Sequence, residues 1–243
     1  EGWYNDFATW DPAASSSVTT LRVPNDTGDG LLKFVGAGST QPLRMDLKPG
    51  LAQSWETSPD GLTLTFKLTD KAKWHNKPPL NGRAFKADDA RRVFERNRTL
   101  TGSVSRGFFD NVASIDAVND TTLQLKMKAP QADFLTYLAT RELVIYATEL
   151  AENGALGKNQ DSIGTGAFIL KSAQKSDHIS YVKNPDYWGG APYLDGAEIK
   201  MMPDKSARLA ALRSGQIDFA QSLLANKREA DALRQTKIGR AHV

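Results

Sequence analysis

The chain has 243 residues, 40% of them apolar and 24% charged, which is an ordinary composition for a globular protein. Its 31 basic and 28 acidic residues are interspersed, so the net charge of +3 predicts no nucleic-acid partner and no basic patch for an anionic membrane. The absence of cysteine excludes disulfides, thiolate zinc sites and cysteine nucleophiles, and no apolar run approaches the roughly 20 residues of a transmembrane helix.

The first 50 residues carry mixed signals. Residues 1–12, EGWYNDFATWDP, are rich in aromatic side chains but follow neither the helical nor the strand period. The segment SSSVTTLRV predicts a helix start capped by Ser15 or Ser16, and Pro24 predicts that this helix does not continue regularly. LLKFVG predicts a short strand, and the glycines and prolines of GAGSTQPLRMDLKPG predict a loop over residues 36–50.

Residues 51–100 contain the clearest local pattern of the chain, a β-hairpin followed by a helix. Residues 58–61, SPDG, predict a turn between a strand that holds Trp55 and a strand whose apolar residues alternate, namely Leu62, Leu64, Phe66 and Leu68. The segment FKADDARRVFERN then predicts a helix with one apolar face, formed by Ala87, Ala90 and Phe94.

A second hairpin is predicted over residues 112–130, with its turn at Asn119 and Asp120. Its buried row consists of Leu123, Leu125 and Met127, and a proline ends the strand. The segment QADFLTYLAT predicts an amphipathic helix that points three apolar side chains inward, Phe134, Leu135 and Leu138.

The last third of the chain predicts three strands and a helix. The strands are FILKSA, HISYVK and AEIKMM, and the helix begins at Asp204 and stops at Gly215, after which Ile217 and Phe219 begin a further strand. Strands and helices are mixed without a regular βαβ repeat, so the predicted class is α/β with α+β character. A composition change at residues 164–166 predicts a domain boundary.

No segment carries a recognisable catalytic or metal-binding pattern. The glycines of GAGST and GTG are not followed by the Gly-Lys-Ser/Thr of a phosphate-binding loop. The three histidines, His75, His178 and His242, have no second ligand at metal-site spacing and are interpreted as solvated or hydrogen-bonded. We therefore predict no catalytic residue, no metal and no cofactor, and interpret the chain as a ligand-binding module.

Several segments together resemble one bacterial transport family. PGLAQSWETSPDGLTLTFKLTDKAKWHN, AFKADDARRVFER, IGTGAFIL, KNPDYWGG and ARLAALRSGQIDF occur in the order and spacing of the family 5 extracellular solute-binding proteins of ABC transporters, the peptide- and nickel-binding group. The resemblance runs from about Asp11 to Phe219. It implies a periplasmic-binding-protein type II (Venus-flytrap) lobe with an inserted small α+β subdomain, and no enzyme activity.

The resemblance also implies a domain division and a site. Residues 1–46 begin the first lobe, residues 47–162 form the inserted subdomain, and residues 163–237 return to an incomplete first lobe, with the second lobe absent. Residues 238–243 back-translate as ATC GGA AGA GCA CAC GTC, a frame of a common sequencing adapter, and are interpreted as a read-through artefact. Trp10, Asp11 and Thr165 are expected near the ligand.

The resemblance implies a monomeric full-length receptor, periplasmic or extracellular and either free or lipid-anchored. It would deliver a peptide or another small solute to a membrane permease. Its ligand stays open among oligopeptides, dipeptides, nickel complexes and sugars. With one lobe, we expect weak ligand binding or none, and an open sheet edge. Two other functions stay open: a hydrolase whose site assembles from dispersed Asp and His residues, and a sensory or chaperone role on the same scaffold.

Overall fold

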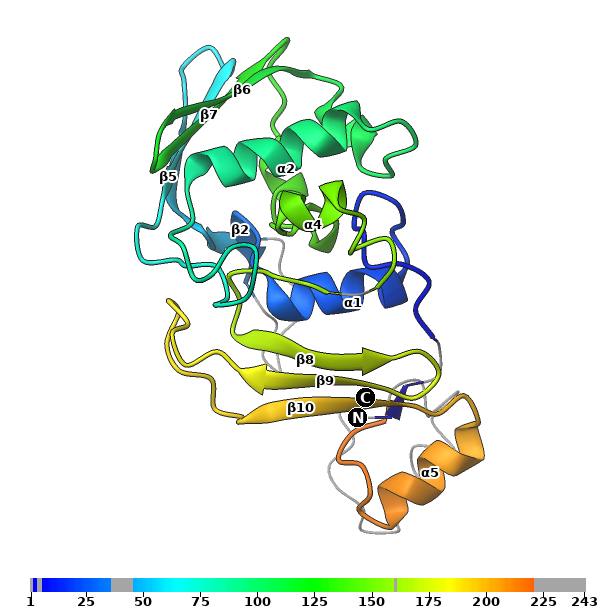
Figure 1. Ribbon diagram of the computed structural model, residues 1–243. Coiled ribbons are helices and arrows are strands. Elements are labelled where there is room, and N and C mark those ends of the chain that lie inside the picture. Colours follow the sequence, from blue (N-terminus) through cyan, green and yellow to red (C-terminus); the bar gives the residue numbers. More distant parts are fainter. Residues whose placement is uncertain (1, 4–5, 36–45, 160, 221–243) are drawn as a thin grey trace.

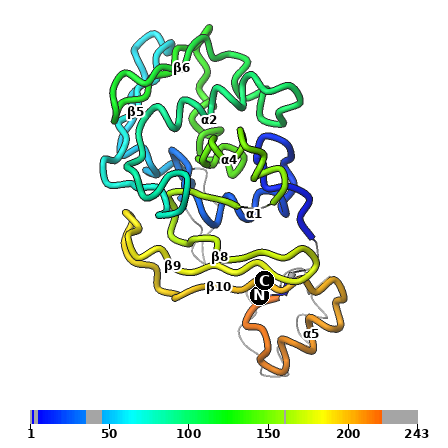
Figure 2. Tube along the Cα trace, in the orientation of Figure 1, coloured from blue at the N-terminus to red at the C-terminus, as the bar shows by residue number. Residues whose placement is uncertain are grey.

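The computed structural model describes residues 2–3, 6–35, 46–159 and 161–220, and these residues form two four-stranded sheets (Figure 1). The upper sheet in the view has the strand order β4-β5-β7-β6, and the lower sheet has the order β1-β10-β9-β8. Figure 2 shows that the chain begins at the lower sheet, builds the upper one, and returns to the lower one. The predicted segment 238–243, with His242, lies outside the described residues.

The upper sheet consists of the two predicted hairpins. Its strands are β4 (Ala52–Thr57), β5 (Thr63–Leu68), β6 (Val112–Asn119) and β7 (Thr122–Met127). Trp55 pairs with Phe66, and the turn before β5 closes on the bond from Ser58 N to Thr63 O at 2.9 Å. Gly61 has φ +72°, a conformation that glycine adopts without strain. Both hairpin predictions are confirmed.

Helix α2 (Ala87–Thr99) covers the buried face of this sheet (Figure 1). The apolar face predicted from the sequence is buried, since Ala87, Ala90 and Phe94 have no exposed surface. The carboxylate of Asp89 accepts a bond from the backbone N of Lys86 at 2.9 Å and so caps the first turn of the helix.

Short segments complete the upper part of the molecule. They are the 3₁₀ turns η1 (Arg106–Phe109) and η2 (Arg141–Leu143) and the helices α3 (Phe134–Tyr137) and α4 (Thr148–Glu152). Helix α3 has four residues where the sequence predicted a longer helix, and Leu135 is only partly buried. A cluster of aromatic rings takes the place of a continued helix, with Phe134 packed on Phe109 and Tyr137 stacked on Phe108.

The lower sheet combines local hairpins with one distant strand. The hairpin strands β8 (Phe168–Gln174), β9 (His178–Lys183) and β10 (Gly196–Met201) agree with the three predicted ones. Strand β1 (Gly2–Trp3) pairs in parallel with β10, although residues 1–12 show no strand period. Within the described residues, the strand predicted from Ile217 reduces to one bridge, between Ala220 and Gly2.

Helix α1 (Val18–Thr27) corrects the sequence prediction twice. Its cap is Ser17, whose Oγ accepts from Thr20 N at 3.1 Å, and not Ser15 or Ser16. Pro24 lies inside the helix and does not end it. Proline removes the backbone donor that would bond Thr20 O, yet the helix continues for three more residues, and Asn25 Nδ2 adds a bond to Leu21 O at 2.8 Å.

The remaining elements are a short two-stranded sheet and the helix near the end of the described chain. Strand β2 (Leu32–Phe34) agrees with the prediction, but it pairs with β3 (Leu47–Pro49) inside the segment that was expected to be a loop. Helix α5 (Lys205–Arg213) is capped by Asp204, whose Oδ1 accepts from Ala207 N at 2.7 Å. Among the described segments, no helix has the length and apolarity to span a membrane.

Candidate functional site

Thr165, one of the three residues expected near the ligand, lies in a tightly packed loop. Gly164 and Gly166 press against the end of α1, where Gly166 N donates to Thr27 O at 2.8 Å. A β-carbon on Gly164 would lie 2.2 Å from that same oxygen, so a larger residue does not fit. The glycines of this GTG segment therefore serve close packing, and Thr165 itself is fully buried.

The hydroxyl of Thr165 donates to Asp29, which is the centre of a buried polar network. The Oδ2 atom of Asp29 accepts from Thr165 Oγ1 and from Trp188 Nε1, both at 3.1 Å. Its Oδ1 atom accepts from Tyr187 OH at 3.1 Å and from Lys33 Nζ at 2.6 Å. A buried carboxylate needs such partners because it has left water. We call these five residues the Asp29 junction.

The electrostatics of the junction follow from the buried carboxylate. Burial alone would lower the pKa of Lys33, but the charge of Asp29 and its hydrogen bond outweigh burial and raise that pKa. Burial raises the pKa of the Tyr187 hydroxyl, and the neighbouring Asp29 adds to the effect. Lys33 therefore stays charged and Tyr187 stays protonated at neutral pH, so both keep donating to Asp29.

His75 supports the junction from the other side of the GTG segment. It is buried, its Nε2 bonds Gly166 O at 3.0 Å, and its Nδ1 faces Gly164 N at 3.5 Å. The backbone N–H of Gly164 points at Nδ1, so we assign the proton to Nε2. Burial lowers the pKa of His75 to about 4. This histidine is hydrogen-bonded, as the sequence indicated.

Trp10 and Asp11, the other two expected residues, form a separate cluster. The Trp10 ring is fully buried with its centroid 5.2 Å from that of Phe7, and its backbone N donates to Leu156 O at 3.0 Å. Asp11 binds the guanidinium of Arg96 through both oxygens, at 2.8 and 2.6 Å. Arg96 also donates to Tyr146 OH at 2.8 Å. We call the Asp11–Arg96–Tyr146 group the Asp11 clamp.

The clamp fastens the N-terminal loop onto α2. Asp11 Oδ1 also accepts from Ala13 N at 3.1 Å, which fixes the chain just before the largely exposed residues 14–18. Burial raises the pKa of Tyr146 to about 12, against the opposing charge of Arg96. The structure thus joins Trp10 and Asp11 to one cluster and Thr165 to another, and no hydrogen bond described for these residues links the two.

The sequence pattern did not identify Asp29 as a site residue, because a single Asp after a helix is typical of an ordinary turn. It placed Tyr187 and Trp188 in a core. Both are partly buried, and their polar ends bind Asp29. The available signal for the site was the pair Tyr187 and Trp188, because aromatic residues with a polar end usually bind a polar partner when they are buried. The separation of Asp29 from these partners, 158 and 159 positions, hid the contact.

One surface cluster bears on the hydrolase alternative. His178 Nε2 lies 3.0 Å from Ser172 Oγ, and His178 Nδ1 lies 2.9 Å from Asp177 Oδ2. The order of atoms matches a catalytic triad, but a triad carboxylate is buried and orients its histidine. The Asp177 side chain is 59% exposed here. We interpret the three residues as a solvated contact on β8 and β9.

Metal binding has no support in the described ranges. No group of three or more His, Asp or Glu residues there could hold a metal ion. His75 is committed to backbone groups, and His178 to Ser172 and Asp177.

Comparisons with known proteins point to one family. The profile described as "Bacterial extracellular solute-binding proteins, family 5 Middle" matches residues 46–238. A putative ABC transporter peptide-binding protein of Brucella ovis is 36% identical over 176 residues, covering 70% of this chain and 32% of the relative. Heme-binding protein A of Haemophilus influenzae is 34% identical over 194 residues, covering 72% and 36%.

A solved structure gives the same picture. The periplasmic binding protein DppA of Helicobacter pylori, in complex with the peptide STSA, superposes with a TM-score of 0.74 at 29% identity. The match covers 89% of this chain and 44% of that protein. The chain thus spans about a third of the length of the curated relatives it matches and less than half of this solved structure.

Proposed function

The chain belongs to the bacterial extracellular solute-binding proteins, family 5, and from this premise we propose that it forms part of a receptor that captures a peptide or similar small solute for an ABC importer. The receptor hands the solute to a membrane permease. It acts in the periplasm or outside the cell, as a monomer, either free or anchored by a lipid. The proposal takes the chain as one wall of the binding cleft and a second lobe as the other.

The observation that carries this proposal is the agreement of sequence and fold over the same residues. The family profile matches residues 46–238, and the Helicobacter pylori peptide complex superposes on 89% of the chain. The type II periplasmic-binding-protein fold expected from the sequence is confirmed. Fold alone does not set function, so the proposal depends on both.

The names of relatives favour a peptide as the solute. The Brucella relative is named for peptide binding, and the Helicobacter structure holds a peptide. Heme-binding protein A shows that a different cargo is carried on a similar sequence. We therefore propose a peptide, with the contacts that select it supplied mainly by parts of the receptor outside this chain.

Within the chain, we propose that residues 1–46 and 163–237 belong to the first lobe and that residues 47–162 form the inserted subdomain. Trp10, Asp11 and Thr165 would lie close to the solute without touching it, because their side chains are almost completely buried. The Asp11 clamp would hold the exposed residues 14–18 toward the cleft. Thr165 would act through Asp29.

The test is a peptide titration with two proteins. The 243-residue chain and a receptor obtained by extending the same reading frame are titrated with the tetrapeptide STSA and a dipeptide mixture by calorimetry. Because a cleft ligand is buried between two walls, we expect Kd values weaker than about 1 mM for the chain and near about 1 µM for the longer receptor. A chain that binds at micromolar Kd alone would contradict the two-wall proposal. Cleavage products of the peptide in the calorimeter sample would favour the hydrolase alternative.

A further inference from the structure

A pocket of about 430 Å³ opens beside the C-terminal end of α1. This volume lies within the range of small-molecule sites. The walls come from the end of α1, from β2, from the segment that contains η2, and from the start of β8. The lining residues that matter for recognition are Lys33, Phe34, Arg141, Val144, Phe168 and Tyr187.

One side of the pocket is apolar. Val144 is buried, while Phe34 and Phe168 are partly exposed and present ring surface. Burying part of such surface under a ligand is favourable, at roughly 25 cal/mol per Å². Leu32 and two alanines, Ala139 and Ala167, extend the same wall. This side suits an aliphatic or aromatic body.

The other side carries two cations and two acids, but the acids already have partners. Asp26 accepts from Arg22 Nε at 2.6 Å, and Asp29 accepts from the four donors of the junction. Neither carboxylate therefore offers a strong site for a ligand cation.

The two cations keep unused hydrogen-bonding capacity. An ammonium has three donors, and Lys33 Nζ directs one at Asp29 and a second at the Tyr187 hydroxyl, which leaves one for a ligand. Among the described residues, Arg141 forms an ion pair with Glu142, whose carboxylate lies 3.4 Å from Nε. The Arg141 side chain is half exposed. Such a long surface contact contributes little, so the forked end of Arg141 is available to a carboxylate.

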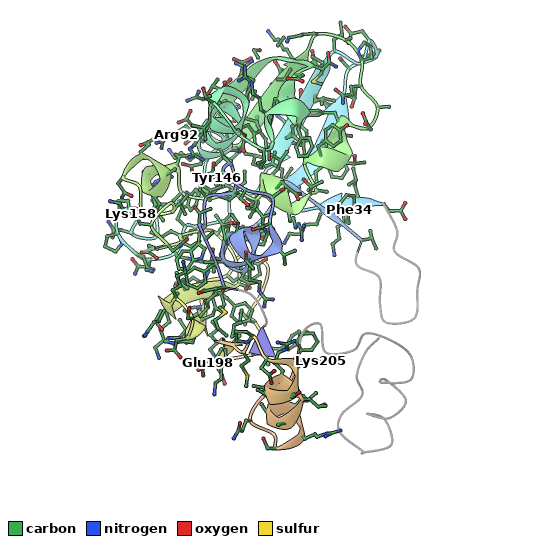
Figure 3. All side chains as sticks on the ribbon, turned by 90° about the vertical axis from the view of Figure 1, so that its right-hand side faces the viewer. Phe34, Arg92, Tyr146, Lys158, Glu198 and Lys205 are labelled. Carbon is green, nitrogen blue, oxygen red and sulfur yellow. The ribbon has the colours of Figure 1, made fainter. Side chains whose placement is uncertain are left out.

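We propose that this pocket binds a small amphipathic carboxylate, with its apolar body against Phe34 and Phe168 and its charged group at Arg141 and Lys33. The site goes beyond the proposed solute transport. It lies at the C-terminal half of α1, whereas the Asp11 clamp precedes the other end of this ten-residue helix, which is about 15 Å long. Figure 3 shows Phe34 on one side of the molecule, apart from Tyr146 of the clamp.

A bound carboxylate would connect two parts of the chain. Arg141 and Val144 belong to the segment around η2, and Phe168 and Tyr187 belong to β8 and the loop after β9; Lys33 is on β2. Binding therefore stabilises the contact between the parts, because a ligand that touches both favours the conformation in which they are joined.

The test uses naphthylacetate as the probe and its neutral amide, naphthylacetamide, as the chemical control. Both are titrated into the 243-residue chain by calorimetry, and the melting temperature is followed in parallel. We expect saturable binding of naphthylacetate and at least about tenfold weaker binding of the amide, because the amide lacks the charge that Arg141 and Lys33 attract.

Two variants test whether the probe binds in this pocket. Arg141→Gln removes the forked cation, and Ala139→Phe fills the pocket from its apolar side; each should weaken naphthylacetate at least about tenfold. Arg91→Gln is the control, since this arginine lies outside the pocket and pairs with Asp88 on α2. It should bind like the parent chain.

The proposal is overturned by any of three results. These are no saturable naphthylacetate binding up to about 10 mM, equal binding of acid and amide, or equal binding by the parent chain and Arg141→Gln. Peptide binding by the longer receptor is measured separately, so its success or failure leaves this outcome distinct.

Discussion

The Asp11 clamp and the Asp29 junction both hold a carboxylate out of water, but they satisfy it in different ways. Asp11 has one main partner, the forked guanidinium of Arg96. Asp29 has one ammonium and three neutral donors. The stability of the clamp therefore depends on a single charge pair. In the junction, four hydrogen bonds together stabilise the buried carboxylate, and the surrounding backbone is closely packed. Four substitutions or conditions separate these two designs.

The largest effect is expected where the junction has no free space. Gly164→Ala places a β-carbon 2.2 Å from Thr27 O, and backbone must move to relieve the clash. We expect a loss of about 4 kcal/mol in the free energy of unfolding, measured by urea denaturation. Gly107→Ala is the control, because no atom lies within 4 Å of its added carbon. Equal stability of the two variants would show that the GTG segment is not tightly packed.

Breaking the clamp should come next. Asp11→Asn keeps the shape but removes the negative charge, which leaves Arg96 partly buried without its counter-ion. We expect a loss of about 3 kcal/mol. Asp88→Asn removes the acid of an exposed ion pair on α2 and should change stability by less than about 0.5 kcal/mol. A small effect of Asp11→Asn would mean that water replaces the pair.

Acid should weaken the junction through His75. Its pKa falls from 6.5 in the unfolded chain to about 4 in the fold, so the unfolded state binds more protons between these values. Stability is then complete above pH 6.5 and is lost as the pH falls. We expect a loss of about 2 kcal/mol from this residue between about pH 7.5 and pH 5.

His75→Gln removes the titrating ring, so urea denaturation of this variant should show a flatter pH dependence over the same interval. An NMR titration of the His75 ring in the parent chain provides an independent check. A ring that titrates near pH 6.5 in the folded chain would contradict the burial argument.

The smallest effect is expected from removing one of four donors. Thr165→Val keeps the volume but withdraws one hydrogen bond from Asp29, which retains three others. We expect a loss of about 1 kcal/mol, visible as a shift in the urea midpoint. A loss as large as that of Asp11→Asn would mean that the junction depends on each bond, and the contrast with the clamp would fail.

That Trp10, Asp11 and Thr165 lie close to the solute stays a prediction. Sequence reasoning placed all three near a ligand on the strength of the family resemblance. The structure buries all three: Asp11 in the clamp, Thr165 in the junction, and Trp10 against Phe7. Sequence reasoning passed over Asp29, since nothing beside it along the chain identifies its partners.

The sequence by itself determined the elements whose signals are local. The hairpin around Trp55 and Phe66 and the face of α2 follow from alternation, helical spacing and turn chemistry within a few residues. The family also followed from the sequence, because short motifs in a fixed order are more specific than any single one.

Only the tertiary structure decided the rest. Strand β1 exists because it pairs with β10, nearly two hundred positions away, and not because its residues prefer a strand. Pro24 stays inside α1, which continues to Thr27 with Leu21, Val23 and Pro24 buried against the rest of the fold. Asp29 gains its partners at Thr165, Tyr187 and Trp188 across more than 130 positions. Such contacts form only when chain folding brings distant segments together, and no local pattern encodes them.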